Sequence, residues 1–146
     1  MQKFEEKILS GEFDAAKVVT ERMNKDELMQ EILYLACKTR NVSIYGFVVN
    51  ELLNAEKVEW HYIAAEMLLA PLSIIDGAYA LGVYHARKAI QLEPENLEHK
   101  KLLLAFYSTP EPVISREEAI NLSKEIIVFE PNNESALEIL QDDNRK

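Results

Sequence analysis

Apolar residues recur at intervals of three and four along almost the whole chain, which is the spacing of one face of an α-helix. No run alternates cleanly with period two, although the valine-rich segment 42–49 leaves a strand open as an alternative. The pattern therefore predicts an all-α protein of eight or nine helices. We expect them over residues 2–9, 12–23, 25–38, 41–53, 56–70, 77–92, 95–107, 115–129 and 131–140.

The expected helix starts carry recognisable capping residues. Asn24 is followed three residues later by Glu27, which is the spacing of a capping box, and the same spacing recurs at Ser115. Pro94 and Pro131 are expected in the first turn of the helices that follow, where proline's missing N–H is not needed. The connections are short throughout, so successive helices should be antiparallel neighbours.

Two segments 37 residues apart match each other in pattern. Residues 86–96 and 123–133 each contain the end of an apolar helix, then Glu-Pro-x-Asn, and each is followed by another helical stretch. A helix that is closed by proline and restarted at once makes a helical hairpin. A hairpin that recurs at a fixed period indicates an array that buries its core between neighbouring units.

From about residue 63 onward this repeat resembles the tetratricopeptide family, which pairs two helices in each unit of roughly 34 residues. The first unit matches the family's pattern at Leu69, Ala70, Gly77, Tyr79, Gly82, Ala89 and Pro94. The second unit, which has three extra residues in the 110–115 loop, matches at Leu103, Leu104, Tyr107, Ala119, Ile126 and Pro131. The resemblance implies antiparallel hairpins stacked as a superhelix. It also implies that Gly82 and Ala89 face the partner helix of their own unit at close range.

The composition fits one globular domain. The chain has 146 residues, of which 48% are apolar and 28% charged. We expect a single helical-repeat domain over residues 1–146, with irregular hairpins over 1–62, tetratricopeptide-like repeats over 63–140 and a frayed tail over 141–146. Leu137 and Leu140 would begin a third, terminal unit.

The cysteine content and the N-terminal sequence predict a cytoplasmic protein. Cys37 is the only cysteine, so no internal disulfide can form. Glu5 and Glu6 stand where a signal peptide needs an apolar run. No run reaches the roughly 18 apolar residues that a membrane-spanning helix requires.

The charge is strongly negative and unevenly distributed. The formal net charge is −9, and residues 91–143 hold 12 acidic residues against four basic ones. Such a surface repels nucleic acid and anionic membranes and attracts a basic protein. The plain alternative is that the acidity only keeps the protein in solution.

Residues that could carry chemistry are few. None of the three histidines, His61, His85 and His99, has a second potential ligand at zinc-binding spacing, and a single histidine on a helix is typical of a surface or boundary position. Cys37 lies beside apolar helical positions and is expected to be buried and unreactive. The four glycines stand singly, without a phosphate-binding loop. We therefore expect no catalytic residue, metal or cofactor, and predict that the chain is not an enzyme.

Binding of acidic chaperone tails is excluded by the groove positions that the resemblance implies. Tetratricopeptide domains of that type need a cluster of Lys, Arg and Asn in the groove. The corresponding residues here are Met67 and Pro71 in one unit and Lys101 and Ala105 in the next. One lysine does not make such a clamp, and the surrounding charge has the wrong sign.

The remaining class is a protein whose activity is binding another protein. We expect an immunity or inhibitor protein that neutralises a basic toxin such as a nuclease, and the whole chain resembles small bacterial immunity proteins. Two alternatives stay open. One is a tetratricopeptide-type scaffold or adaptor in a larger assembly, and the other is a regulator that senses a peptide. No nucleic acid, membrane or small-molecule substrate is expected as a partner.

The candidate partner-binding residues lie in the acidic C-terminal half. They are Glu95, Glu98, Lys101, Glu111, Glu117 and Glu118. Within this half, the 110–115 loop is held extended by two prolines and is expected to contribute specificity.

Overall fold

The computed structural model describes residues 2–111 and 113–145, and over these residues it contains nine helices and no strand. The helices are α1 (Gln2–Leu9), α2 (Phe13–Thr20), α3 (Lys25–Thr39), α4 (Val42–Asn54), α5 (Val58–Leu69), α6 (Ala78–Leu92), α7 (Leu97–Ala105), α8 (Arg116–Phe129) and α9 (Glu134–Asn144). The all-α class and the expected number of helices are confirmed for this part of the chain.

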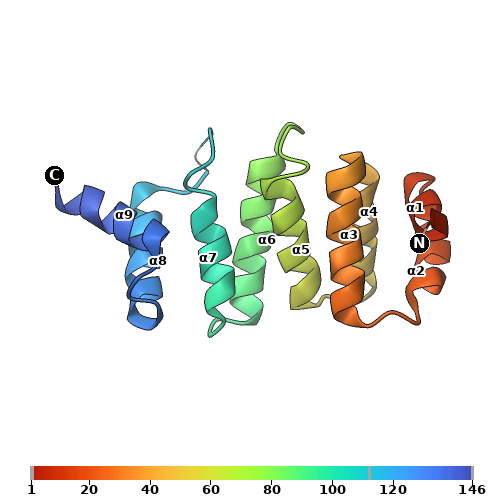
Figure 1. The fold of residues 1–146 in the computed structure, drawn as a ribbon, viewed down its shortest axis with the longest axis horizontal. Coiled ribbons are helices and arrows are strands. Elements are labelled where there is room, and N and C mark those ends of the chain that lie inside the picture. The colour runs from red at the N-terminus through yellow and green to blue at the C-terminus, as the bar shows by residue number, and fades with distance from the viewer. Residues whose placement is uncertain (1, 112, 146) are drawn as a thin grey trace.

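The helices form one row of antiparallel hairpins, with α1 at one end and α9 at the other (Figure 1). Most helices pack mainly on a neighbour along the chain, and the most extensive contact is between α5 and α6. Helix α3 packs on both α4 and α5, and α1 also contacts α4. Helices α3, α5, α7 and α9 also line hollows together, as described below. Within the described residues, no helix has both the length and the apolar character needed to cross a bilayer.

The predicted caps form, one of them only in part. Asn24 accepts a hydrogen bond from the backbone N–H of Glu27 at 2.9 Å, and the Glu27 carboxylate accepts from the backbone N–H of Asn24 at 3.4 Å. Ser115 accepts from the backbone N–H of Glu118 at 3.0 Å. The Glu118 carboxylate instead accepts from Arg87 of α6 at 2.6 Å, so an ion pair between helices replaces the second half of the capping box.

The strand alternative for residues 42–49 is wrong. Asn41 accepts from the backbone N–H of Ser43 at 2.9 Å and starts α4, which continues to Asn54. The decisive feature is the helical spacing of its buried positions, because a strand would bury every second residue. These positions are Ile44, Phe47, Val48 and Glu51.

Pro94 and Pro131 lie in turns before their helices, not in the first helical turn as predicted. The following asparagine in each segment, Asn96 or Asn133, provides the helix cap, so each helix begins three residues after its proline. The last helix is longer than expected, since it runs to Asn144 through most of the predicted tail. Pro112 of the expected specificity loop and Lys146 lie outside the described residues.

Two apolar cores follow each other along the row. We call them the N-terminal core, which includes Phe4, Ile32 and Phe47, and the C-terminal core, which includes Phe106 and Ile126. Helix α5 contributes to both. Its N-terminal-core residues are Trp60, Ile63, Ala64, Met67 and Leu68, and its C-terminal-core residues are Tyr62, Ala65 and Leu69.

Gly82 lies where α6 approaches helices on both sides. A Cβ atom at this position would be 3.4 Å from Cβ of Leu68 in α5 and only 2.5 Å from the ring of Phe106, the residue that follows α7. The predicted close approach to α5 is therefore present, but the tighter contact is with the helix of the following unit.

We predict that Ala89→Leu destabilises the protein by about 1–2 kcal/mol. Ala89 is completely buried on α6, so three added carbon atoms must displace packed neighbours. Urea unfolding followed by circular dichroism would measure the change. Leucine at Lys88, which is only partly buried on the same helix, is the control and should have a smaller effect. Equal stability of the Ala89→Leu variant and the parent would contradict the prediction.

Candidate functional site: an acidic groove

The first Glu-Pro-x-Asn segment joins α6 to α7 through a polar link. Asn96 donates through Nδ2 to Oε1 of Glu93 at 3.2 Å, and its Oδ1 accepts from the backbone N–H of Glu98 at 3.0 Å. The glutamate thus orients the asparagine, and the asparagine caps the next helix.

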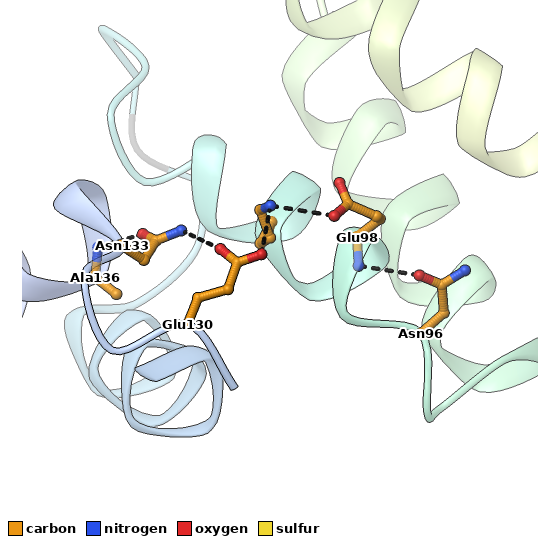
Figure 2. A network of polar contacts seen from close by, with 6 residues as sticks. Asn96, Glu98, Glu130, Asn133 and Ala136 are labelled. Atoms are coloured by element: carbon orange, nitrogen blue, oxygen red, sulfur yellow. Dashed lines mark hydrogen bonds and ion pairs between the residues drawn. The ribbon is translucent and has the colours of Figure 1, made fainter. Parts of the chain in front are cut away.

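The second segment repeats this arrangement between α8 and α9. Asn133 donates to Oε2 of Glu130 at 3.0 Å and caps α9 by accepting from the backbone N–H of Ala136 at 3.0 Å (Figure 2). Lys101 of α7 donates to Oε1 of Glu130 at 3.0 Å and to Glu98 at 3.1 Å. The pKa of Lys101 is raised mainly by the hydrogen bond to Glu130 and to a smaller extent by that to Glu98. Lys101 therefore links the start of α7, which follows the first Glu-Pro-x-Asn segment, to the glutamate of the second segment.

A hollow of about 440 Å³ opens between α3, α5 and the start of α7, and we call it the central hollow. Its apolar and aromatic lining comes mainly from Met29, Val58, Tyr62, Ile63 and His99. Its charged residues are five carboxylates and one lysine, namely Asp26, Glu59, Glu66, Glu93, Glu98 and Lys25. The central hollow therefore combines an apolar lining with a strongly negative charge.

Most of the carboxylates in the central hollow have partners. Glu59 forms an ion pair with Lys25, and Glu98 forms one with Lys101. Hydrogen bonds from His99 and then from Asn96 lower the pKa of Glu93. Three of the five carboxylates of the hollow therefore have a partner.

Glu66 differs from the other carboxylates of the hollow. It is half-buried, and burial raises its pKa, an effect that the neighbouring Tyr62 hydroxyl partly opposes. No lysine or arginine forms an ion pair with Glu66 within the described residues. A half-buried carboxylate without a cation is a costly group and a candidate ligand for one.

His99 contributes a second unsatisfied group. Its Nε2 lies 2.8 Å from Oε1 of Glu93, and its Nδ1 is buried without any hydrogen-bond partner. Because the Glu93 carboxylate accepts, Nε2 carries the proton in the neutral ring, and Nδ1 presents a free lone pair. The Tyr62 ring packs against the imidazole with the ring centroids 5.5 Å apart.

A second hollow, of about 340 Å³, lies beside the first between α7 and α9. Lys101 and Ala105 line it from α7, and Glu138 and Asp142 line it from α9. With the central hollow it forms a discontinuous groove along one side of the row. The groove is lined by every second helix from α3 onward.

The structure separates the six predicted partner-binding residues. Glu98 lines the central hollow and Lys101 the second one, while Glu95 lies exposed in the intervening turn between α6 and α7. The other three lie elsewhere. Glu111 borders a hollow beside the turn between α5 and α6, and Glu117 and Glu118 lie in the first turn of α8.

The groove positions predicted in α5 are wrong. Met67 is completely buried in the N-terminal core, and the α5 residues that line the central hollow include Tyr62 and Glu66. The cause is the eight-residue connection 70–77, which is longer than the resemblance implied and changes the alignment of the two units. In α7 the prediction was correct, since Lys101 and Ala105 do line a hollow.

All three histidines are buried, contrary to prediction, and two of them form a hydrogen-bonded chain. Nδ1 of His61 lies 2.9 Å from Nδ1 of His85. The chain extends from His61 Nε2 to Glu56 at 2.8 Å, and from His85 Nε2 to the Tyr45 hydroxyl at 2.8 Å. It therefore connects α4, α5 and α6.

One proton arrangement satisfies every bond of this chain. The hydrogen bond from His61 lowers the pKa of Glu56, so the carboxylate is ionised and only accepts. His61 then donates through Nε2, His85 donates through Nδ1 to His61, and Tyr45 donates to His85 Nε2. The four groups are hydrogen-bonded one after another and do not surround a common point where a ligand could bind. Among the described residues, no group of three His, Cys, Asp or Glu side chains is placed to hold a metal ion.

Cys37 is exposed, contrary to the predicted buried thiol. The residue before it, Ala36, is completely buried together with Ile32. One helical step of about 100° carries Cys37 past the edge of that buried face.

No family model, curated protein or solved structure matches this chain.

Proposed function

We propose that this protein is a non-enzymatic inhibitor of the immunity type, which binds a basic protein such as a nuclease toxin through its acidic groove. The observation that carries the proposal is the central hollow, where five carboxylates and one lysine surround an apolar and aromatic lining. Such a surface combines attraction for positive charge with area that can be desolvated.

The chemistry of nucleases supports a basic partner. A nuclease obtains much of its affinity for nucleic acid from lysines and arginines that contact phosphates. An acidic groove can cover that same surface and so block it. The matching Glu-Pro-x-Asn closures support a tetratricopeptide-like array as the framework that presents the groove.

A salt- and charge-dependent association rate tests the proposal. The protein that co-purifies from the native cell would be identified, and its association measured by stopped flow. At low salt, Asp26→Lys with Glu98→Lys should slow association about tenfold, because both carboxylates line the central hollow. Physiological salt should reduce the difference.

Glu117→Lys with Glu118→Lys is the matched control. It makes the same change in net charge, also in the first turn of a helix, but away from the central hollow. This pair should slow association less than the groove pair. A partner that is not basic, or a rate indifferent to salt and to both double variants, would contradict the proposal. A basic partner whose activity is unaffected by binding would favour the scaffold alternative over an inhibitor.

A further inference from the structure

We propose that the central hollow receives a lysine or arginine side chain of the basic partner, with its charged head between Glu66 and His99 and its aliphatic part against Met29 and Ile63. This inference rests on the proposed function, and it names the group by which the partner is recognised.

The first argument is the unequal pairing of charge in the hollow. Glu59 and Glu98 already have lysine partners, whereas Glu66 has no cation and lies deeper. An ammonium or guanidinium group would supply the missing charge at Glu66. Burial of the pair is favourable only if the remaining donors of the cation also find acceptors.

The second argument is the unpartnered nitrogen of His99. The side chain is more than nine-tenths buried and lines the hollow, and its Nδ1 is a buried acceptor without a hydrogen-bond partner. A buried acceptor without a donor costs free energy, which a donor from a ligand would recover. Lysine and arginine carry several N–H donors and no acceptor, so they complement both Glu66 and His99.

The third argument is the shape and lining of the hollow. Its volume of about 440 Å³ accommodates a long side chain, and Met29, Val58 and Ile63 provide apolar contacts for the methylene groups. The half-buried Tyr62 ring packs against His99 and shields it. Binding therefore requires this ring to rotate away from the imidazole, where its face can then contact the cation.

The inference is tested with defined peptides, without the native partner. Gly-Arg-Gly, Gly-Lys-Gly and Gly-citrulline-Gly, with blocked ends, would be titrated into the protein at low salt and followed by NMR. We expect the arginine or the lysine peptide to change the NMR chemical shifts of Met29, Ile63 and the Tyr62 ring, and these changes should saturate as peptide is added. The His99 Nδ1 resonance should also move as it accepts a hydrogen bond. The citrulline peptide, which is uncharged but has nearly the shape of arginine, should bind at least tenfold more weakly.

The pH dependence gives a second readout. Because Glu66 binds the cation only when ionised, affinity should fall as the pH is lowered through its raised pKa, and bound peptide should lower that pKa. The other charged or titratable groups that face the hollow are the same in the wild-type protein and in the two variants described below, Glu66→Gln and Glu117→Gln. They are Lys25, Asp26, Glu59, Tyr62, Glu93, Glu98, His99 and Lys101.

Glu66→Gln removes the charge and keeps the shape, and it should weaken peptide binding at least fivefold. Glu117→Gln makes the same change of charge on α8 and should alter binding less than twofold. Measurements on the wild-type protein alone can also overturn the inference. They would do so if the citrulline peptide bound as tightly as the charged peptides, or if the NMR shift changes were centred on Glu117 and Glu118. If a basic partner binds and is insensitive to Glu66→Gln, the inference fails while the proposed function stands. If the peptides behave as expected but the native partner is not basic, the proposed function fails.

Discussion

Between pH 7 and pH 4 the folded protein should lose about 3 kcal/mol of stability through His85 alone. Burial, and next the charge of His61, lower the pKa of His85 from 6.5 to about 4. Each unit of difference between the folded and unfolded pKa corresponds to about 1.4 kcal/mol. The unfolded chain therefore binds a proton at His85 below pH 6.5, whereas the folded chain does so only near pH 4. The free energy of unfolding consequently falls as the pH is lowered across that window.

Burial is the main reason why His85 resists protonation, and the chain of hydrogen bonds also limits how many protons the histidine pair can carry. A single extra proton on the histidine pair is accommodated, because one proton still lies between the two Nδ1 atoms. A second proton would direct two N–H groups at each other across 2.9 Å. Around His85 the other titratable or charged groups are Tyr45 on α4, Glu56 before α5, and Tyr84 and Lys88 on α6.

His85→Gln provides the measurement. Urea unfolding of the variant and the parent from pH 7 to pH 4 should give curves that converge toward low pH, because the parent alone loses the contribution of His85. A constant difference between them would contradict the prediction. NMR titration of the His85 ring in the parent gives an independent value of the pKa and does not depend on whether the variant folds.

Gly82→Ala should destabilise the protein by about 2 kcal/mol, although alanine favours helix more than glycine does. The new Cβ would lie 2.5 Å from the ring of Phe106, which is completely buried and so cannot swing out into solvent. Overpacking of this kind costs about 3 kcal/mol, and the helix propensity of alanine offsets about 1 kcal/mol of that. Equilibrium unfolding in urea measures the net effect.

Gly46→Ala is the matched control for Gly82→Ala. Its Cβ would meet only the tip of the Phe13 ring at 3.1 Å, and Phe13 is partly exposed, so the ring can yield. This variant should be close to neutral. Phe106→Leu combined with Gly82→Ala should be less destabilised than the sum of the two single changes, since the smaller side chain relieves the overlap. Additive effects would show that the two positions do not clash.

The helices could be predicted from the sequence because each is specified locally. Apolar spacing defined the buried faces, and Asn24, Asn41 and Ser115 marked helix starts. The prolines were misplaced because Pro94 and Pro131 are compatible with either a turn or a first helical turn. In each case the asparagine two residues later decided the boundary, by capping the helix.

The groove could be predicted only in part, because it depends on how helices distant in sequence are aligned. Lys101 was placed correctly within one unit, but Tyr62 and Glu66 were missed because the eight-residue connection 70–77 changes the register of α5. The burial of the histidines was also missed. His61 and His85 satisfy each other across two helices, and no local pattern encodes such a pair.

The position of α5 between the two cores has a consequence for how the molecule comes apart. In a row where each hairpin is held by its neighbours, the ends can open while the middle remains folded. Amide hydrogens of α1 and α9 should therefore exchange with solvent soonest, and those of α5 and α6 last, since this pair shares the most extensive contact and α5 anchors both cores. The central hollow is lined by α5 of that pair together with α3 and the start of α7, none of which lies at an end of the row, so it would keep its shape while the ends fray and reform.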